Sequence, residues 1–432
     1  MKQRRIALAF VTVLTLSASL VACSSPSQDQ GKQTVTFWEF DTSEASIAAY
    51  KSAITDFEKL NPDITVDMQI VPWSDQQQKI TTALATGALP DVSMLGNDVV
   101  AQYAASGSLA SLTPFVDGWS KEEGADYLGD LYDGDKSYYT YKGELYGAPL
   151  ADETRMLYYN KAIFTQAGLD PDSPPTTWAE MQSAAEAIKN AGLVGWSLPM
   201  SNQYVTVQTF MSVYLSYGAT LFNSDGKCGL DAPKFKDALS YYTGIAGAGL
   251  TSPDAANQTN DDLANLFSNG GSGMLIDGPG RYTAIKNDTP DLFANLGVAP
   301  IPAGPEGAFG FLGGWPLVLW NTSDAKDAAA KWIHYATSPQ GALSAIAGTS
   351  GILPARKSLA AQKPWTDEPY AAFATQLGKA YAYQYPAGPS PFMGQIETES
   401  IQKAVQQVAT GAMSVADATT QLCSDIDGIL SK

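Results

Sequence analysis

Acidic residues stand where predicted strands end or where the chain crosses between predicted lobes. They are Asp41, Asp98, Asp152 and Glu153. Two carboxylates ~5–9.5 Å apart can cleave a glycosidic bond, so a secreted glycoside hydrolase is one hypothesis. Carboxylates and aromatic rings can also hold a ligand without reacting with it. A binding site is therefore the competing hypothesis.

Other residue types that catalysis commonly uses are scarce. His334 is the only histidine, and we expect it to pack within a helix at residues 325–335. Without a second histidine the chain has neither a Ser-His-Asp triad nor a histidine-rich metal site. Gly278 and Gly280 lack the spacing of a dinucleotide-binding loop. We therefore predict no catalytic residue, no metal site and no cofactor.

The first cysteine ends an export signal. A cationic start and an apolar stretch at residues 6–16 lead to Leu20-Val21-Ala22-Cys23. This pattern resembles the bacterial lipoprotein signal, in which residues 1–22 are removed and Cys23 carries the lipid; an ordinary secretory signal is the alternative. Residues 23–33 are then a flexible tether. We expect the protein at the extracellular face of the cytoplasmic membrane.

The other two cysteines are Cys228 and Cys423. In an exported protein two remaining cysteines commonly form a disulfide. Two buried free thiols are the alternative.

Length and charge limit the possible classes of protein. The chain has 432 residues, and single hydrophobic cores stop growing at about 250–300 residues, which predicts two lobes. The formal charge of −18 becomes −21 once residues 1–22, with three cationic side chains, are removed. Such an acidic protein is repelled by phosphate backbones, so nucleic-acid binding is excluded. No other segment approaches the ~18 apolar residues of a membrane helix.

Strands and helices alternate at the start of the chain. Apolar periodicity predicts strands at 35–38, 64–70 and 92–95 and helices at 47–57 and 79–86. This order is typical of a parallel sheet covered by helices on both faces, in which ligands bind beyond the carboxyl ends of the strands. Those ends lie at residues 38–42, 72–75 and 96–98.

Glycine and proline mark a crossing between the lobes. Gly147 and Pro149 precede an apolar-aromatic run at 156–159 that reads as a buried strand. We predict hinge crossings at 146–150 and 296–304. Lobe 1 then comprises residues 34–147 and 301–345, and lobe 2 comprises residues 150–298 and 348–432.

Several short motifs occur in a fixed order behind the signal. They are Pro90-Asp91, Gly107-Ser-Leu109, Tyr146-Gly-Ala-Pro149, Tyr159-Asn160-Lys161, Thr177-Trp178, Phe267-Ser-Asn-Gly270 and Leu353-Pro-Ala-Arg356. In this order they resemble the extracellular solute-binding proteins of ABC importers, in the sugar-binding family that includes maltose-binding protein. The resemblance covers nearly the whole mature chain.

The resemblance implies a fold and a function. The fold is a two-lobed α/β structure of the periplasmic-binding-protein type (type II), each lobe a mostly parallel sheet flanked by helices. The lobes close by hinge motion over an oligosaccharide. The family is not enzymatic: its members deliver their ligand to a membrane permease, and we expect a monomer.

Three charged residues fall on family positions. Glu153 follows the Tyr-Gly-Ala-Pro crossing where the family has a sugar-binding glutamate, with a salt bridge to Arg155 as the alternative. Asp98 matches a family aspartate, with a helix N-cap as the alternative. Arg356 resembles an arginine that can reach the cleft.

Aromatic rings would complete a sugar site, because sugars present hydroxyls at their edge and apolar C–H faces. Trp73 and Trp315 are the candidates, with packing as the alternative. Gly314 and its neighbour would let a ligand or another part of the backbone approach Trp315 closely. Leu95 and Gly280 replace aromatic residues of maltose-binding protein, so the maltose site itself is not reproduced.

The remaining candidates lie in segments expected to face the cleft, with ordinary packing roles as the alternative. They are Trp38, Glu39, Asp41, Asn97, Asn202, Tyr204, Asp277, Arg281, Tyr282 and Tyr383. A cationic or phosphorylated solute in the same fold is a further hypothesis. A phosphate would require more arginines than this cleft is expected to offer.

Overall fold

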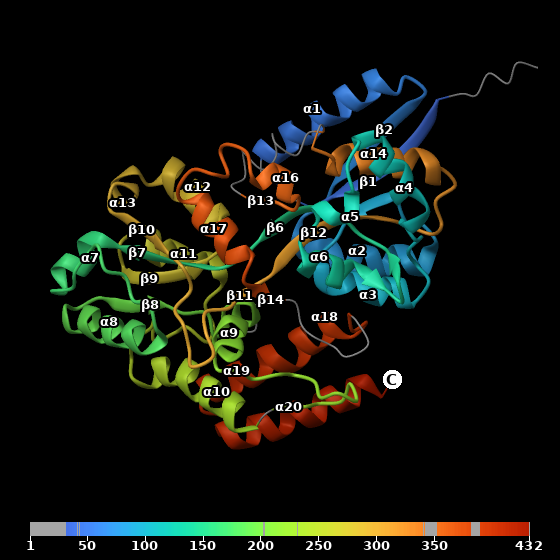
Figure 1. Cartoon of the computed structure of the whole chain (residues 1–432). Coiled ribbons are helices and arrows are strands. Elements are labelled where there is room, and N and C mark those ends of the chain that lie inside the picture. Colours follow the sequence, from blue (N-terminus) through green and yellow to red (C-terminus); the bar gives the residue numbers. More distant parts are fainter. Residues whose placement is uncertain are drawn as a thin grey trace, which may run out of the picture. The chain divides into compact units, whose positions relative to one another are not determined.

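The computed structural model describes residues 32–40, 42, 44–201, 204–230, 232–339, 341, 352–381 and 389–431. Two larger sheets organise this part of the chain (Figure 1), and two hydrophobic clusters, the first core and the second core, pack against them. The first core also includes Tyr158 and Leu275 of the second sheet. None of the helices in these ranges combines the length and hydrophobicity of a membrane span.

The first sheet has six strands in the order β13-β6-β12-β3-β1-β2. They are β1 (Gln33–Glu39), β2 (Ile64–Ile70), β3 (Val92–Met94), β6 (Ala148–Glu153), β12 (Gly313–Leu319) and β13 (Leu353–Pro354). β1 is parallel to β2 and β3, whereas β12 and β13 are antiparallel to their neighbours. The sheet is mixed rather than mostly parallel, because only the first three strands are joined by helical crossovers.

Helices flank this sheet. They are α1 (Glu44–Leu60), α2 (Trp73–Thr86), α3 (Asn97–Ala105), α4 (Thr113–Glu123), α5 (Tyr127–Asp130), α6 (Asp133–Tyr139) and α14 (Lys326–Thr337). A hairpin of β4 (Thr140–Tyr141) and β5 (Glu144–Leu145) follows α6. The helix predicted at 79–86 begins earlier, at Trp73, because the polar residues of its first turns hid the apolar period.

Aromatic rings fill the first core. Trp332 of α14 packs against Phe37 of β1 and Phe57 of α1, with ring centroids 5.7 and 5.3 Å apart. The buried indole of Trp320 donates a hydrogen bond to Ser93 Oγ at 2.7 Å. By the strand register Phe37 and Ser93 lie on opposite faces of the sheet, so these contacts tie sequence-distant elements to both of its faces.

The second sheet has four strands in the order β10-β7-β9-β8. They are β7 (Met156–Asn160), β8 (Val194–Ser197), β9 (Ser272–Asp277) and β10 (Leu296–Ala299). Its helices are α7 (Lys161–Gln166), α8 (Trp178–Asn190), α9 (Tyr204–Ser216), α10 (Ala232–Gly247), α11 (Asn260–Ser268), α12 (Gly280–Asp288) and α13 (Pro290–Phe293). Thr177 and Glu180 cap α8 reciprocally, as the sequence predicted.

C-terminal helices complete the second core. They are α18 (Met393–Gln395), the π-helix η1 (Ile396–Ile401), α19 (Gln402–Ala409) and α20 (Val415–Leu430). The predicted disulfide between Cys228 and Cys423 is present, with Cα atoms 5.4 Å apart. It joins a loop before α10 to α20.

The first crossing lies later than predicted. β6 belongs to the first sheet and β7 to the second, so the chain crosses at residues 154–155 rather than 146–150. Gly147 is required for packing: a Cβ there would lie 3.0 Å from Pro316 and 3.1 Å from Tyr139. The strand at 156–159 is confirmed as the first strand of the second sheet.

The other connections also differ from the prediction. The return runs from β10 to β12 through residues 300–312, where β11 (Gly310–Phe311) pairs with β14 (Ala380–Tyr381). β13, α16 (Lys357–Ala360) and α17 (Tyr370–Leu377) contribute residues to the first core. The expectation that all of 348–432 belongs to lobe 2 is therefore wrong for this part, because β13 pairs with β6.

Candidate ligand-binding site

A cavity of about 1010 Å³ lies between elements of the two cores. α2, α3, β6 and β12 line it on the side of the first sheet, and α9, α18 and η1 on the side of the second. Six predicted residues line it: Trp73, Asn97, Asp98, Glu153, Gly314 and Trp315. The structure thus brings together side chains from segments more than 200 residues apart.

Two tryptophans supply apolar surface. Trp73 opens α2, is 40% exposed, and its ring centroid lies 5.6 Å from that of Phe40. Trp315 lies on β12, half-buried against the first core. Phe311 and Phe392 also line the cavity. Flat rings of this kind suit the C–H faces of a sugar.

Asp98 lies in the first turn of α3. Gly96, not Asp98, is the N-cap, and no side chain caps the helix. Burial raises the pKa of Asp98 to about 6, and its own backbone N–H opposes this rise. A Cβ on Gly394 would lie 3.0 Å from Asp98 Oδ2, so this glycine lets α18 approach the carboxylate.

Glu153 lines the cavity and also forms the predicted salt bridge. Arg155 donates two hydrogen bonds to its carboxylate, at 3.3 and 3.2 Å. Burial raises the pKa of Glu153, with a smaller contribution from Asp277, while Arg155 opposes the rise. The two alternatives for Glu153 therefore occur together.

Arg155 does not line the cavity itself but contacts three residues that do. Besides Glu153, it donates a hydrogen bond to Gln208 Oε1, and its guanidinium carbon lies 5.8 Å from the ring centroid of Phe311. Asp277 of β9 lies 3.5 Å from Arg155 Nη1. One buried guanidinium thus fixes side chains from both sheets.

Some predicted residues lie behind the cavity wall. Asp277 accepts a hydrogen bond from Arg281 Nε at 2.8 Å. Tyr282 packs against Phe293 and Tyr370. Neither Asp277, Arg281 nor Tyr282 is among the lining residues, because α12 turns away from the cavity after β9.

Asn97 and the glycines of β12 make contacts within the protein. Asn97 Nδ2 donates a hydrogen bond to the Leu312 carbonyl at 2.9 Å. A Cβ on Gly313 would lie 2.6 Å from Glu153 Cγ, and one on Gly314 2.6 Å from the Tyr139 hydroxyl. Both glycines line the cavity and make room for neighbouring side chains, and the close approach of a ligand to Trp315 stays a prediction.

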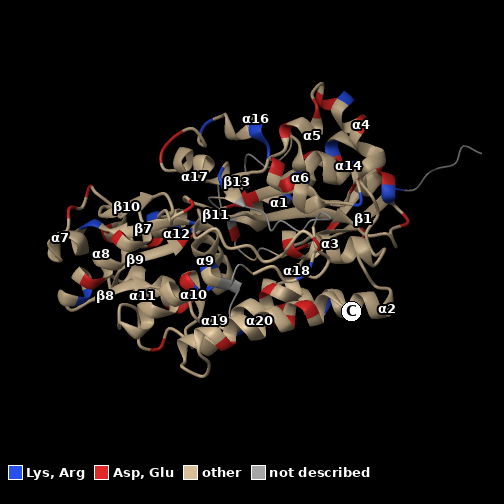
Figure 2. Ribbon diagram, turned by 60° about the horizontal axis from the view of Figure 1, so that its bottom comes forward, with Lys and Arg blue, Asp and Glu red and all other residues tan. Residues whose placement is uncertain are grey.

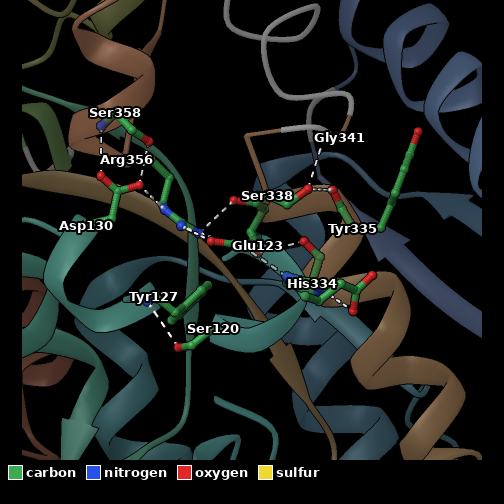
Figure 3. Close-up of polar contacts among 12 residues, drawn as sticks. Ser120, Glu123, Tyr127, Asp130, His334, Tyr335, Ser338, Gly341, Arg356 and Ser358 are labelled. Atoms are coloured by element: carbon green, nitrogen blue, oxygen red, sulfur yellow. Dashed lines mark hydrogen bonds and ion pairs between the residues drawn. The ribbon is translucent and has the colours of Figure 1, made fainter. Parts of the chain in front are cut away.

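Other predicted residues lie away from the cavity. Trp38 and Glu39 are buried in the first core, and Lys79 Nζ lies 4.5 Å from the Trp38 ring centroid. Arg356 is buried between Glu123 and Asp130 (Figure 3). Asp41, Asn202, Tyr383 and the side chain of Tyr204 lie outside the described residues.

Asp152 is not a cavity residue either. It is fully buried and faces Asp135 of α6. Burial raises the pKa of Asp135 to about 7 and that of Asp152 well above its usual range, and the charge of Asp135 adds to the rise at Asp152. Of the carboxylates considered for hydrolysis, only Asp98 and Glu153 among the described residues line the cavity.

Sequence reasoning missed most of the polar lining. The missed residues include Gln76, Gln77, Gln102, Gln208, Gln395, Thr398 and Glu399. Gln76 and Gln77 of α2 lie about one helical turn after Trp73 and could have been found from the helix period. Gln395, Thr398 and Glu399 could not have been found in this way, because only tertiary packing brings α18 and η1 to the cavity. π-Helical turns such as η1 often occur at functional sites.

Comparison with known proteins agrees with this architecture. The family model of the bacterial extracellular solute-binding proteins matches residues 41–343. A putative binding protein of Brucella abortus (strain 2308) is 31% identical over 325 residues, covering 74% of this chain and 75% of that protein. The diacetylchitobiose binding protein of Streptomyces coelicolor is 27% identical over 380 residues, covering 82% of this chain and 83% of that protein.

A solved structure extends the likeness to the fold. An ABC transporter solute-binding protein from Thermotoga lettingae, bound with α-D-tagatose, superposes with a TM-score of 0.81 at 27% identity. The match covers 92% of this chain and 100% of that one. The chain therefore belongs to the bacterial extracellular solute-binding proteins, in the sugar-binding ABC transporter group.

Proposed function

We propose that this protein is the lipid-anchored receptor of an ABC importer, which captures an oligosaccharide in the cavity and delivers it to a membrane permease. The observation that carries the proposal is the cavity lining, where Trp73 and Trp315 stand among amide and carboxylate side chains. Such a lining matches the apolar faces and hydroxyl edge of a sugar.

The size of the cavity favours an oligosaccharide over a single sugar ring. Ligand pockets commonly measure about 300–1,000 Å³, and this one, at about 1010 Å³, is at the upper end. Two similar proteins bind sugars: the Streptomyces coelicolor protein is named for diacetylchitobiose, and the Thermotoga lettingae protein is bound with tagatose.

Anchoring and closure belong to the same proposal. Cys23 would carry the lipid that holds the protein at the extracellular face of the membrane. The segments at 154–155 and 300–312 join the two sheets and would act as hinges, since a few residues at element ends can absorb such a motion. The protein would act as a monomer and without a cofactor.

The test is calorimetric titration against a panel of neutral oligosaccharides: maltotriose, cellotriose, raffinose and N,N′-diacetylchitobiose. We expect saturable binding of at least one member. Trp315→Ala and Glu153→Ala should each weaken that binding without unfolding the protein. The matched control is Leu60→Ala, which removes an exposed apolar side chain from α1.

Three results would contradict the proposal. Unchanged affinity in both cavity variants would place the site elsewhere. Release of reducing ends from the panel would identify a hydrolase. Binding of a polyamine or phosphate ester, with no carbohydrate bound at millimolar concentration, would replace the sugar by another solute.

A further inference from the structure

The cavity carries charge of one sign. Its charged side chains among the described lining residues are Asp98, Glu153 and Glu399, and no Lys, Arg or His is present there. The chain as a whole has 44 acidic and 26 basic residues, and Figure 2 shows acidic positions on helices of both cores. The cavity is therefore an acidic site in an acidic protein.

The internal positions that the structure does not describe add no cationic residue to the site. The internal positions that the structure does not describe are 41, 43, 202–203, 231, 340, 342–351 and 382–388. Their sequence contains no Lys, Arg or His. Whichever of them contributes to the site, no cationic side chain is added.

The three carboxylates differ in how far the protein balances their charge. Glu153 is paired with Arg155. Glu399 accepts a hydrogen bond from Gln395 Nε2 at 2.7 Å. Asp98 has no ion pair within the described ranges: its carboxylate accepts a hydrogen bond from its own backbone N–H, and the neighbouring side chains, such as Tyr103, are uncharged.

A ligand can supply the positive charge that is missing near the Asp98 carboxylate. A carboxylate that is withdrawn from water is stabilised by an opposite charge within about 4–6 Å and destabilised by a like charge. An ammonium donor binds this carboxylate more strongly than a hydroxyl donor does, because the ammonium adds an opposite charge at short distance. A uronate or phosphate at this position would be repelled.

We propose that Asp98 makes the cavity selective for oligosaccharides that carry a protonated amino group, over neutral ones, and that acidic oligosaccharides are rejected. The inference rests on the proposed function, since it specifies the ligand class of the same cavity. Trp73 and Trp315 can still contact the sugar faces, because an amino group in place of a hydroxyl leaves those faces unchanged.

The test measures the Kd of three trimers by calorimetry at pH 7. Chitotriose carries free amino groups, its N-acetylated counterpart is neutral, and trigalacturonate carries carboxylates. We expect chitotriose to bind about tenfold more tightly than the acetylated trimer, and trigalacturonate to give no measurable binding. Equal or weaker binding of chitotriose, or binding of trigalacturonate, would overturn the proposal.

The outcomes separate this inference from the function on which it rests. If neither chito-oligosaccharide binds while a member of the neutral panel does, the amine preference is wrong and oligosaccharide capture stands. If no oligosaccharide of either series binds, the proposed function itself fails.

A variant and a salt series assign the effect to Asp98. In Asp98→Asn the ratio of the two Kd values should fall to about one, whereas Asp133→Asn, which changes a carboxylate that is 91% exposed outside the cavity, should preserve it. In the wild type the ratio should also shrink as salt is raised, because ions screen charges in accessible sites. An unchanged ratio in either experiment would refute a role for Asp98.

Discussion

Two buried arginines, Arg356 and Arg155, each bridge two carboxylates, but in different settings. Arg356 donates to Asp130 at 2.8 Å and to Glu123 at 3.3 Å (Figure 3), all on elements that pack with the first core. Arg155 joins Glu153 of the first sheet to Asp277 of the second. The first network fixes one lobe, and the second spans the crossing beside the cavity.

The two networks also differ in how completely they are satisfied. Arg356 has acceptors on both carboxylates and on the Thr337 carbonyl, and Tyr127 lies beneath its guanidinium at 4.6 Å. The Nε of Arg155 is buried without an acceptor within the described ranges. A saturated network stabilises one arrangement, whereas an unsaturated one can exchange partners. The Arg155 network would therefore suit the hinge motion that we propose, whereas the Arg356 network would not.

The carboxylate pKa values follow the same division. Burial tends to raise the pKa of Glu123, but hydrogen bonds from His334 and Arg356 outweigh it and the pKa is lowered. Hydrogen bonds from Ser358 and Arg356 lower the pKa of Asp130 in the same way. For Glu153 burial prevails and the pKa is raised.

The largest effect is expected for Arg356→Ala. Removing one partner of a buried ion pair leaves Glu123 and Asp130 uncompensated, which should lower the free energy of unfolding by about 3–5 kcal/mol. Urea denaturation measures this loss. Replacing the two carboxylates as well, by Glu123→Gln and Asp130→Asn, should recover part of the lost free energy of unfolding. A loss below about 1 kcal/mol would show that the network is not structural.

Arg155→Ala should act on binding more than on stability. Glu153, Gln208 and Phe311 lose their common contact, so we expect the affinity for the neutral oligosaccharide that the wild type binds to fall about 10- to 100-fold. Titration calorimetry gives this value, with Arg155→Lys as the conservative comparison. If Arg155→Ala left affinity intact but lowered stability as much as Arg356→Ala, the contrast between the networks would disappear.

A third buried group differs from both arginine networks, because the carboxyls of Asp135 and Asp152 face each other instead of a cation. The folded pKa of each is above its unfolded value, so the folded state binds more protons and stability should fall as pH rises from about 4 to 7. Between pH 5 and 8 the wild type should lose about 1–3 kcal/mol more than Asp135→Asn. Unfolding free energies at the two pH values decide this, and parallel losses would contradict it.

The smallest effect is expected for Glu399→Gln. This side chain is exposed, and its hydrogen bond to Gln395 is an i, i+4 contact on the helix surface. Stability should change by no more than about 0.5 kcal/mol, and thermal unfolding can verify it. A larger loss would mean that η1 depends on this contact.

Local patterns allowed much of the fold to be predicted. Alternating apolar residues located β2, and the Thr177–Glu180 capping box located the start of α8. The apolar run at 156–159 located β7. These elements follow from neighbouring residues alone, because helix and strand periods are properties of the segment itself.

Candidate site residues were predictable in part from their position in the chain. Asp98 follows β3, Glu153 ends β6 and Trp315 follows a glycine pair, and all three line the cavity. Arg356 satisfied the same reasoning from its motif but lies in a buried network. Which way a side chain faces depends on the element packed against it, and a motif does not contain that information.

The sequence by itself determined the acidic charge, the two-lobe organisation and most helices and strands, because these depend on length, composition and local periodicity. Tertiary structure alone decided that β6 joins the first sheet and that β13 pairs with it. It also decided that α18 and η1 line the cavity. The physical reason is that a strand's alternation defines its faces but not its partner, so pairing and wall assembly depend on residues far away in the chain.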